Sequence, residues 1–220
     1  MKAMQGLKAD LLRGCWYIAA ISHEVKPGKM VDKTLLGEKI VIARGSDGKV
    51  FALRNFCPHR GIPLHHGQVE GASIRCCYHG WRFDGEGACI EIPSLREGQK
   101  VDLGKINCGA YRVEERYGLI WIYMSNDGEE PDAGLMPDVD IFPGVDPDAP
   151  PAAAIMLPFD CSVDHAAFGL MDPTHAAYIH TSWWFKSGAT KLRPKEKSFA
   201  PSDFGWAMVR HPLPPKPSGW

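Results

Sequence analysis

The sequence predicts an α+β protein in which an antiparallel β domain, residues 15–125, precedes a partly helical segment that begins at residue 161. Three observations support this fold class. Short apolar runs alternate with turn residues up to about residue 125, prolines then concentrate in the chain, and an Ala-rich stretch follows them. Short strands separated by turns are typical of antiparallel sheets, because a tight turn can join neighbouring strands.

The strands of the first domain are expected where apolar or β-branched residues follow one another. Asp47-Gly48 separates two such runs and predicts a hairpin, and Tyr117-Gly118 predicts a second turn. Between the two turns, residues 55–89 are dense in Cys, His and Gly and show no periodic pattern, so we expect loops there. The predicted strands are residues 16–20, 39–44 and 49–54 and two strands within 110–124.

Seven prolines between Pro131 and Pro158 predict a linker over residues 126–160, because proline removes backbone donors and fixes φ. Residues 161–180 are Ala-rich and favour a helix. Asp172-Pro173 interrupts this stretch, which predicts a kink or a restart of the helix there. Residues 161–220 are therefore expected to form a second domain.

The composition excludes several classes of protein. With 45% hydrophobic residues and a net charge of -1, the chain is neither disordered nor suited to nucleic acid or an anionic membrane. The sequence contains no run of 18 apolar residues, so no membrane span is expected. The N-terminus lacks the apolar core of a secretory signal. Seven cysteines, an odd number, favour a reducing cytoplasm over a disulfide scaffold.

Two loops each offer one thiolate and one imidazole. Cys57 and His59 lie in CPHRG, Cys76 and His79 lie in CCYHGW, and sixteen residues separate His59 from Cys76. Two Cys and two His suit a tetrahedral zinc site or a Rieske [2Fe–2S] centre, which places two Cys on one iron and two His on the other. The mixed order, Cys then His in both loops, favours the cluster, because each loop can then serve both irons.

The two loops resemble the signature of the bacterial Rieske non-haem iron oxygenases. The resemblance implies that Cys57, His59, Cys76 and His79 bind the cluster and that Cys77 stands at a variable position. Respiratory Rieske proteins carry an additional disulfide between the loops. Ile62 and Tyr78 stand at the corresponding positions here, so that bridge is not expected.

A second constellation follows the proline-rich segment. Asp172 and His175 are three residues apart and share one face of a helix, whereas His180 reaches the same metal only if the helix bends or ends. Two His with a carboxylate form the facial triad of non-haem Fe(II) oxygenases. The spacing resembles the catalytic box of the same family, which implies that His175 and His180 bind Fe(II) while Asp172 bridges an iron-bound His to a cluster-bound His of a neighbouring subunit.

The resemblance implies the terminal oxygenase (alpha) component of a multicomponent system, with an N-terminal Rieske domain and the start of a helix-grip catalytic domain. It implies a ferredoxin or an NAD(P)H-dependent reductase as electron donor, and O₂ and a small aromatic substrate that is hydroxylated or O-demethylated in aromatic hydrocarbon catabolism. A homotrimer is expected. The family's third iron ligand, a distant Asp, has no counterpart in the 220 residues. A Rieske-type electron carrier and a zinc-stabilised binding module remain as alternatives.

Overall fold

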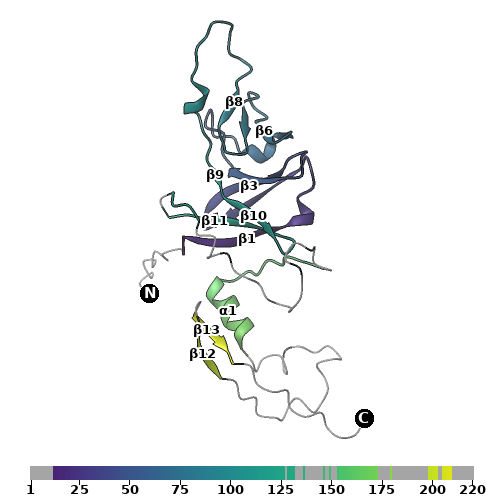
Figure 1. The fold of residues 1–220 in the computed structure, drawn as a ribbon, viewed down its shortest axis with the longest axis vertical. Coiled ribbons are helices and arrows are strands. Elements are labelled where there is room, and N and C mark those ends of the chain that lie inside the picture. Colours follow the sequence, from purple (N-terminus) through teal and green to yellow (C-terminus); the bar gives the residue numbers. More distant parts are fainter. Residues whose placement is uncertain are drawn as a thin grey trace, which may run out of the picture. The chain divides into compact units, whose positions relative to one another are not determined.

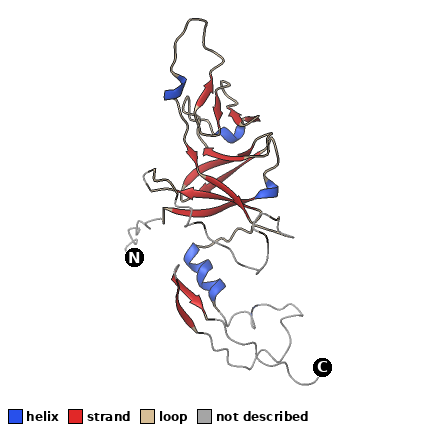
Figure 2. Ribbon diagram, in the orientation of Figure 1, coloured by secondary structure: helices blue, strands red, loops and turns tan. Residues whose placement is uncertain are grey.

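The structure is a computed structural model that describes residues 12–126, 128–131, 136, 146, 149, 153–172, 179, 198–202 and 205–209. The chain divides into two compact units, Met1–Met156 and Leu157–Trp220. Strands dominate the first unit, and every strand pair in it is antiparallel (Figures 1 and 2). The antiparallel β domain predicted from the sequence is confirmed.

The described strands of the first unit form three sheets, in the strand orders β1-β11-β10, β2-β3-β4-β9 and β5-β6-β7-β8. The strands labelled β6 and β8 lie at one end of the unit and those labelled β1 and β10 at the other, with β3 and β9 between them (Figure 1). The described residues of this unit also form the short 3-10 turns η1 (Ser22–Glu24), η2 (Leu64–His66) and η3 (Leu103–Lys105). The strands are β1 (Cys15–Ile21), β2 (Met30–Leu35), β3 (Glu38–Arg44), β4 (Val50–Arg54), β5 (Gln68–Glu70), β6 (Ser73–Arg75), β7 (Arg82–Asp84), β8 (Cys89–Glu91), β9 (Ala110–Tyr111), β10 (Val113–Arg116) and β11 (Leu119–Met124).

The central strand β3 is buried on both faces, which explains its continuous apolar run. Ile40 and Ile42 pack into one core cluster with residues of β1 and β11, whereas Val41 and Ala43 pack into a second cluster on the opposite face. Successive side chains of a strand point to opposite faces, so one strand contributes to two cores. The second cluster also contains Cys57 and Cys76, and it therefore joins the sheet to the two Cys-His loops.

Both turns predicted from the sequence are confirmed. β3 pairs with β4 across Asp47-Gly48, where Gly48 has φ +83° and the Asp47 carboxylate accepts from the Lys49 N–H. β10 pairs with β11 across Tyr117 and Gly118, both of which have positive φ. Two successive residues with positive φ give the turn whose twist matches that of the flanking strands.

The expectation of loops over residues 55–89 is only partly correct, because β5, β6, β7 and the first residue of β8 lie within this range. Each of these strands has three residues, too few to give a readable alternation. Their cohesion comes from the few large side chains that are fully buried, notably Leu64, Ile74 and Phe83. The Cys-His loops therefore extend from a small sheet and not from a long irregular segment.

The second unit contains α1 (Val163–Met171) and the hairpin of β12 (Phe199–Ser202) and β13 (Gly205–Met208). Ser162 caps the helix by accepting from the His165 N–H, and the helix ends at Asp172, where the sequence predicted an interruption. The predicted restart after Pro173 and most of the predicted linker lie outside the described residues. No helix within the described ranges is long and apolar enough to cross a membrane.

An Ile42→Ala variant is expected to lower the free energy of unfolding by about 2–5 kcal/mol, because Ile42 is fully buried and the substitution leaves a cavity between two sheets. Ile90→Ala is the matched control, since Ile90 is 41% exposed, and its change is expected to stay within about 0.5 kcal/mol. Urea unfolding followed by tryptophan fluorescence measures both. Equal losses in the two variants would contradict the assignment of the core.

Candidate metal centre

The two Cys-His loops have the same backbone structure. The Cys57 N–H donates to the Ile62 carbonyl at 2.9 Å and the Gly61 N–H donates to the Cys57 carbonyl at 2.8 Å. In the second loop, the Cys76 N–H donates to the Trp81 carbonyl at 2.8 Å and the Gly80 N–H to the Cys76 carbonyl at 3.1 Å. Each turn thus begins at a Cys and is closed by the fifth residue after it.

A glycine stands at the same position of each turn and has positive φ, +74° at Gly61 and +71° at Gly80. This conformation is costly for residues with a Cβ atom. A Cβ at Gly80 would also approach the Pro93 ring to 3.1 Å. The turns therefore require Gly61 and Gly80, the glycines that follow His59 and His79.

The two thiols are buried together. Cys57 and Cys76 are 2% and 3% exposed and belong to the same apolar cluster. The pKa of the Cys57 thiol is raised to about 11, first by burial and then by the adjacent Cys76, against the backbone N–H groups of His59 and Arg60 that donate to its sulfur. Metal ligation requires thiolates, and a cation is what stabilises two thiolates in such surroundings.

The two imidazoles also form a pair. The rings of His59 and His79 lie 4.5 Å apart between centroids with 60° between their planes, and Trp81 stacks parallel to His59 at 4.5 Å. Burial lowers the pKa of His59, and the charges of His79 and Arg60 lower it further. The neutral imidazole is thereby favoured, which is the form that binds a metal.

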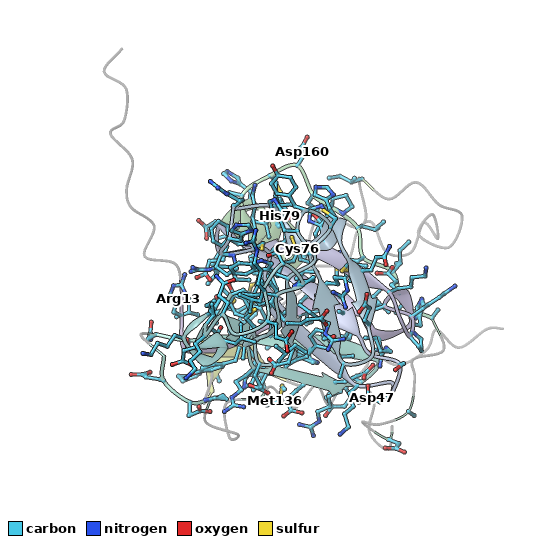
Figure 3. The ribbon with its side chains drawn as sticks, turned by 90° about the horizontal axis from the view of Figure 1, so that it is seen from above. Arg13, Asp47, Cys76, His79, Met136 and Asp160 are labelled. Carbon is cyan, nitrogen blue, oxygen red and sulfur yellow. The ribbon has the colours of Figure 1, made fainter. Side chains whose placement is uncertain are left out.

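The side chains fit a [2Fe–2S] centre. Two thiols lie together and two imidazoles lie together, as a cluster with two Cys on one iron and two His on the other requires. The Nδ1 atom of His59 is buried and has no hydrogen-bond partner within the described chain, so a nitrogen lone pair is left for a metal. Among the described residues, no three His, Cys, Asp or Glu side chains converge on a single ion. Cys76 and His79 are labelled in Figure 3 among the side chains drawn as sticks.

Arg75, immediately before Cys76, braces the second loop. Its Nη1 donates to the Gly80 carbonyl at 2.9 Å, its Nε to Glu70 at 2.7 Å, and Nη1 and Nη2 to Glu91 at 3.2 and 3.1 Å. Arg82 lies within 3.7 Å of Glu70 and 3.3 Å of Glu91. These contacts raise the pKa of Arg75 and lower those of both carboxyl groups. The two loop-facing strands β6 and β7 are thereby held to β5 and β8.

Arg75→Met is expected to accelerate loss of the bound cluster, because the substitution frees the Gly80 carbonyl and leaves Glu70 and Glu91 without their main partner. Arg96→Met is the control, since Arg96 is exposed. The rate at which the visible absorption bleaches in a chelator measures the effect. Equal rates for the two variants would show that Arg75 does not hold the loop.

The residues of the second constellation are only partly described. Asp172 is half-buried and ends α1, with its N–H donating to the Phe168 carbonyl at 3.0 Å. His175 and His180 lie outside the described residues.

All seven cysteines are free, in agreement with the expectation that no disulfide joins the loops, and Cys77 is exposed where Cys76 is buried.

Residues 15–109 match the family described as the Rieske [2Fe-2S] domain, and this range contains both loops. The N-terminal unit therefore carries a Rieske domain. The family match decides the choice between a cluster and a zinc site that the loops alone left open, in favour of the cluster. It also agrees with the separate pairing of thiols and imidazoles in the structure.

The sequence similarity extends beyond the Rieske domain. The iron-sulfur subunit of a toluene-4-sulfonate monooxygenase system from Comamonas testosteroni is 36% identical over 188 residues, which cover 83% of this chain and 50% of the relative. The oxygenase component of dicamba O-demethylase from Stenotrophomonas maltophilia is 35% identical over 169 residues, covering 77% and 48%. The predicted relationship to Rieske oxygenases is confirmed. The chain spans about half the length of these curated relatives.

Solved structures show the same relationship. Apo dicamba monooxygenase matches with a TM-score of 0.53 and 35% sequence identity, over 59% of this chain and 39% of that chain. Dicamba monooxygenase has also been solved with non-heme iron and dicamba, and that structure matches with a TM-score of 0.53 and 34% identity. The matched part of this chain therefore shares its fold with the corresponding part of dicamba monooxygenase.

Sequence reasoning missed the contacts that hold the loops. Trp81, which belongs to the second loop, stacks on His59 of the first, and Arg75 reaches around the second loop to Gly80. The sequence could have suggested the first contact, because Trp81 follows the candidate ligand His79 by only two residues and so lies near the metal site. No sequence signal indicates the second, because Glu70 and Glu91 join Arg75 only after the four short strands have paired.

Proposed function

We propose that the chain acts as the terminal oxygenase component of a multicomponent Rieske system. The observation that carries the proposal is that similarity to oxygenase components covers 188 residues, whereas the Rieske domain accounts for residues 15–109. An electron carrier needs only the domain. The similarity over the rest of the chain includes the segment of Asp172, His175 and His180.

In this proposal, Cys57 and Cys76 hold one iron of the cluster, and His59 and His79 hold the other. His175 and His180 hold a mononuclear Fe(II). The cluster supplies single electrons when bound, and the Fe(II) site supplies the activation of O₂. The protein holds the cluster thiolates in an apolar interior, which limits water around them, and it leaves His79 exposed, where another subunit can reach its ring.

Asp172 is proposed as a carboxylate bridge. A carboxylate accepts hydrogen bonds from two imidazole N–H groups, one of an iron-bound His in its own chain and one of a cluster His in the next subunit. Because this path joins neighbouring subunits head to tail, the assembly is proposed to close into a ring, a homotrimer. Light scattering on the purified protein tests the trimer, and a monomer with full turnover would contradict it.

The proposed substrate is a small aromatic compound that is hydroxylated or O-demethylated, as suggested by relatives named for toluene-4-sulfonate, 3-chlorobenzoate and dicamba. A ferredoxin or an NAD(P)H-dependent reductase is proposed as electron donor, and the cytoplasm as location.

Metal analysis of the complete polypeptide tests the proposal. Two irons and two acid-labile sulfides per chain, with a third iron lost in His175→Ala and His180→Ala, are expected for an oxygenase. Two irons without a third would establish the alternative, an electron carrier. A zinc-only preparation would contradict both.

A further inference from the structure

A buried polar contact spans the first Cys-His loop, hereafter the first ligand loop. Neither Cys57 nor His59 takes part in this contact. Asn55, two residues before Cys57, is 5% exposed. Its side-chain oxygen accepts from the His65 backbone N–H at 3.0 Å, and its Nδ2 lies 2.7 Å from Nδ1 of His65. The Asn55 side chain, which precedes the loop, is therefore hydrogen-bonded to both the backbone and the ring of His65, which follows it.

The donors and acceptors of this contact can be assigned from chemistry alone. A backbone N–H only donates, so the amide atom that faces it is the oxygen Oδ1 of Asn55. The other amide atom is then the NH₂ group, which only donates, so Nδ1 of His65 accepts. The proton of the neutral imidazole lies on Nε2. An aspartate or a leucine at position 55 cannot make the same pair of bonds.

Asn55 is also fixed to the core of the domain. Its backbone N–H donates to the Lys39 carbonyl in β3 at 2.9 Å. On the far side of the loop, Leu64 is fully buried beside His65 and begins η2. The contact thus joins the end of the central sheet to η2. The loop between these two points carries Cys57 and His59, the proposed ligands of one iron each.

The two ligand loops are held in different ways. The second loop is braced by the charged, partly exposed network of Arg75, Glu70 and Glu91. The first has a neutral brace inside the protein, where a lost hydrogen bond leaves buried polar groups unpaired. His66, next to His65, is exposed and its ring lies 4.0 Å from that of His65, yet no hydrogen bond joins the His66 ring to the loop among the described contacts.

We propose that Asn55 is a positioning residue of the cluster, which holds the first ligand loop closed through His65 and so sets the surroundings of Cys57 and His59. This inference rests on the proposed cluster ligands. Removing the contact is expected to change the cluster itself and not only the stability of the fold, because the loop between the two bonded residues contains the ligands.

The test compares Asn55→Leu, His65→Leu and His65→Asn in the cluster-loaded complete chain. Both leucine variants are expected to release the cluster to a chelator at least about 5-fold faster, the effect of roughly one hydrogen bond. They are also expected to shift the EPR g-values and the reduction potential. His65→Asn is expected to stay near wild type, because its side-chain oxygen can take the place of Nδ1. His66→Leu is the matched control and should also behave as wild type.

The outcomes separate the possibilities. If Asn55→Leu does not fold, His65→Leu still decides, because His65 is only half-buried. Wild-type EPR signals and release rate in His65→Leu overturn the inference. Faster release with unchanged EPR signals and a lowered urea midpoint also overturns it, since Asn55 then only stabilises the fold. A wild-type protein that binds no [2Fe–2S] cluster would instead contradict the proposed ligands.

Discussion

A Cys76→Ala variant is expected to lose essentially all of its [2Fe–2S] cluster, whereas Cys77→Ala is expected to keep it. The two residues are neighbours in the sequence but not in their surroundings. Cys76 is 3% exposed and lies in the apolar cluster with Cys57, and its backbone forms both hydrogen bonds that close the second loop. Cys77 is exposed. Only the Cys76 sulfur is therefore placed beside the Cys57 sulfur.

The measurement is the content of iron and acid-labile sulfide in the purified variants, together with the visible spectrum. Cys77→Ala is the matched control, because it removes the same thiol from the next position of the same loop. The reverse outcome would show that Cys77 is the ligand, and the second loop would then have to adopt a conformation that buries Cys77 in place of Cys76. Loss of the cluster in both variants would mean that Cys77 supports the loop in a way its exposure does not indicate.

The candidate ligands of the cluster could be named from the sequence because they belong to a short motif. Cys57 and His59 are two residues apart, Cys76 and His79 are three apart, and the glycine with positive φ in each turn belongs to the same motif. Local turn chemistry thus fixes which side chains face inward. The burial of Cys76 and the exposure of Cys77 agree with the assignment made from the motif.

The braces of the loops could not be predicted from the sequence, because they depend on pairing between distant strands. Glu91 meets Arg75 sixteen residues away only after β6, β7 and β8 have paired. Strands of three residues are too short for a periodic pattern, so the sheet itself was not predicted. The contact between Asn55 and His65 joins residues ten positions apart, and only the folded loop shows that their side chains meet.

Asp172→Asn is expected to lower product formation by at least roughly 10–100-fold, the usual cost of losing a group that orients a metal ligand, while all metals stay bound. An asparagine amide offers one acceptor and one donor where the proposed bridge needs an acceptor for two imidazole N–H groups. The helix end should not change, because α1 is closed by the Asp172 backbone N–H, which donates to the Phe168 carbonyl in either variant.

Asp164→Asn is the matched control, since Asp164 is an exposed carboxylate in the first turn of the same helix. The measurement combines iron content, the visible spectrum of the cluster and product formed in a single turnover by the complete polypeptide. A defect confined to turnover with reduced cluster would locate the fault between the two metals, as a bridge requires. Wild-type turnover in Asp172→Asn would instead leave Asp172 as the residue that ends α1 before Pro173, and the electrons would have to reach the Fe(II) by another route.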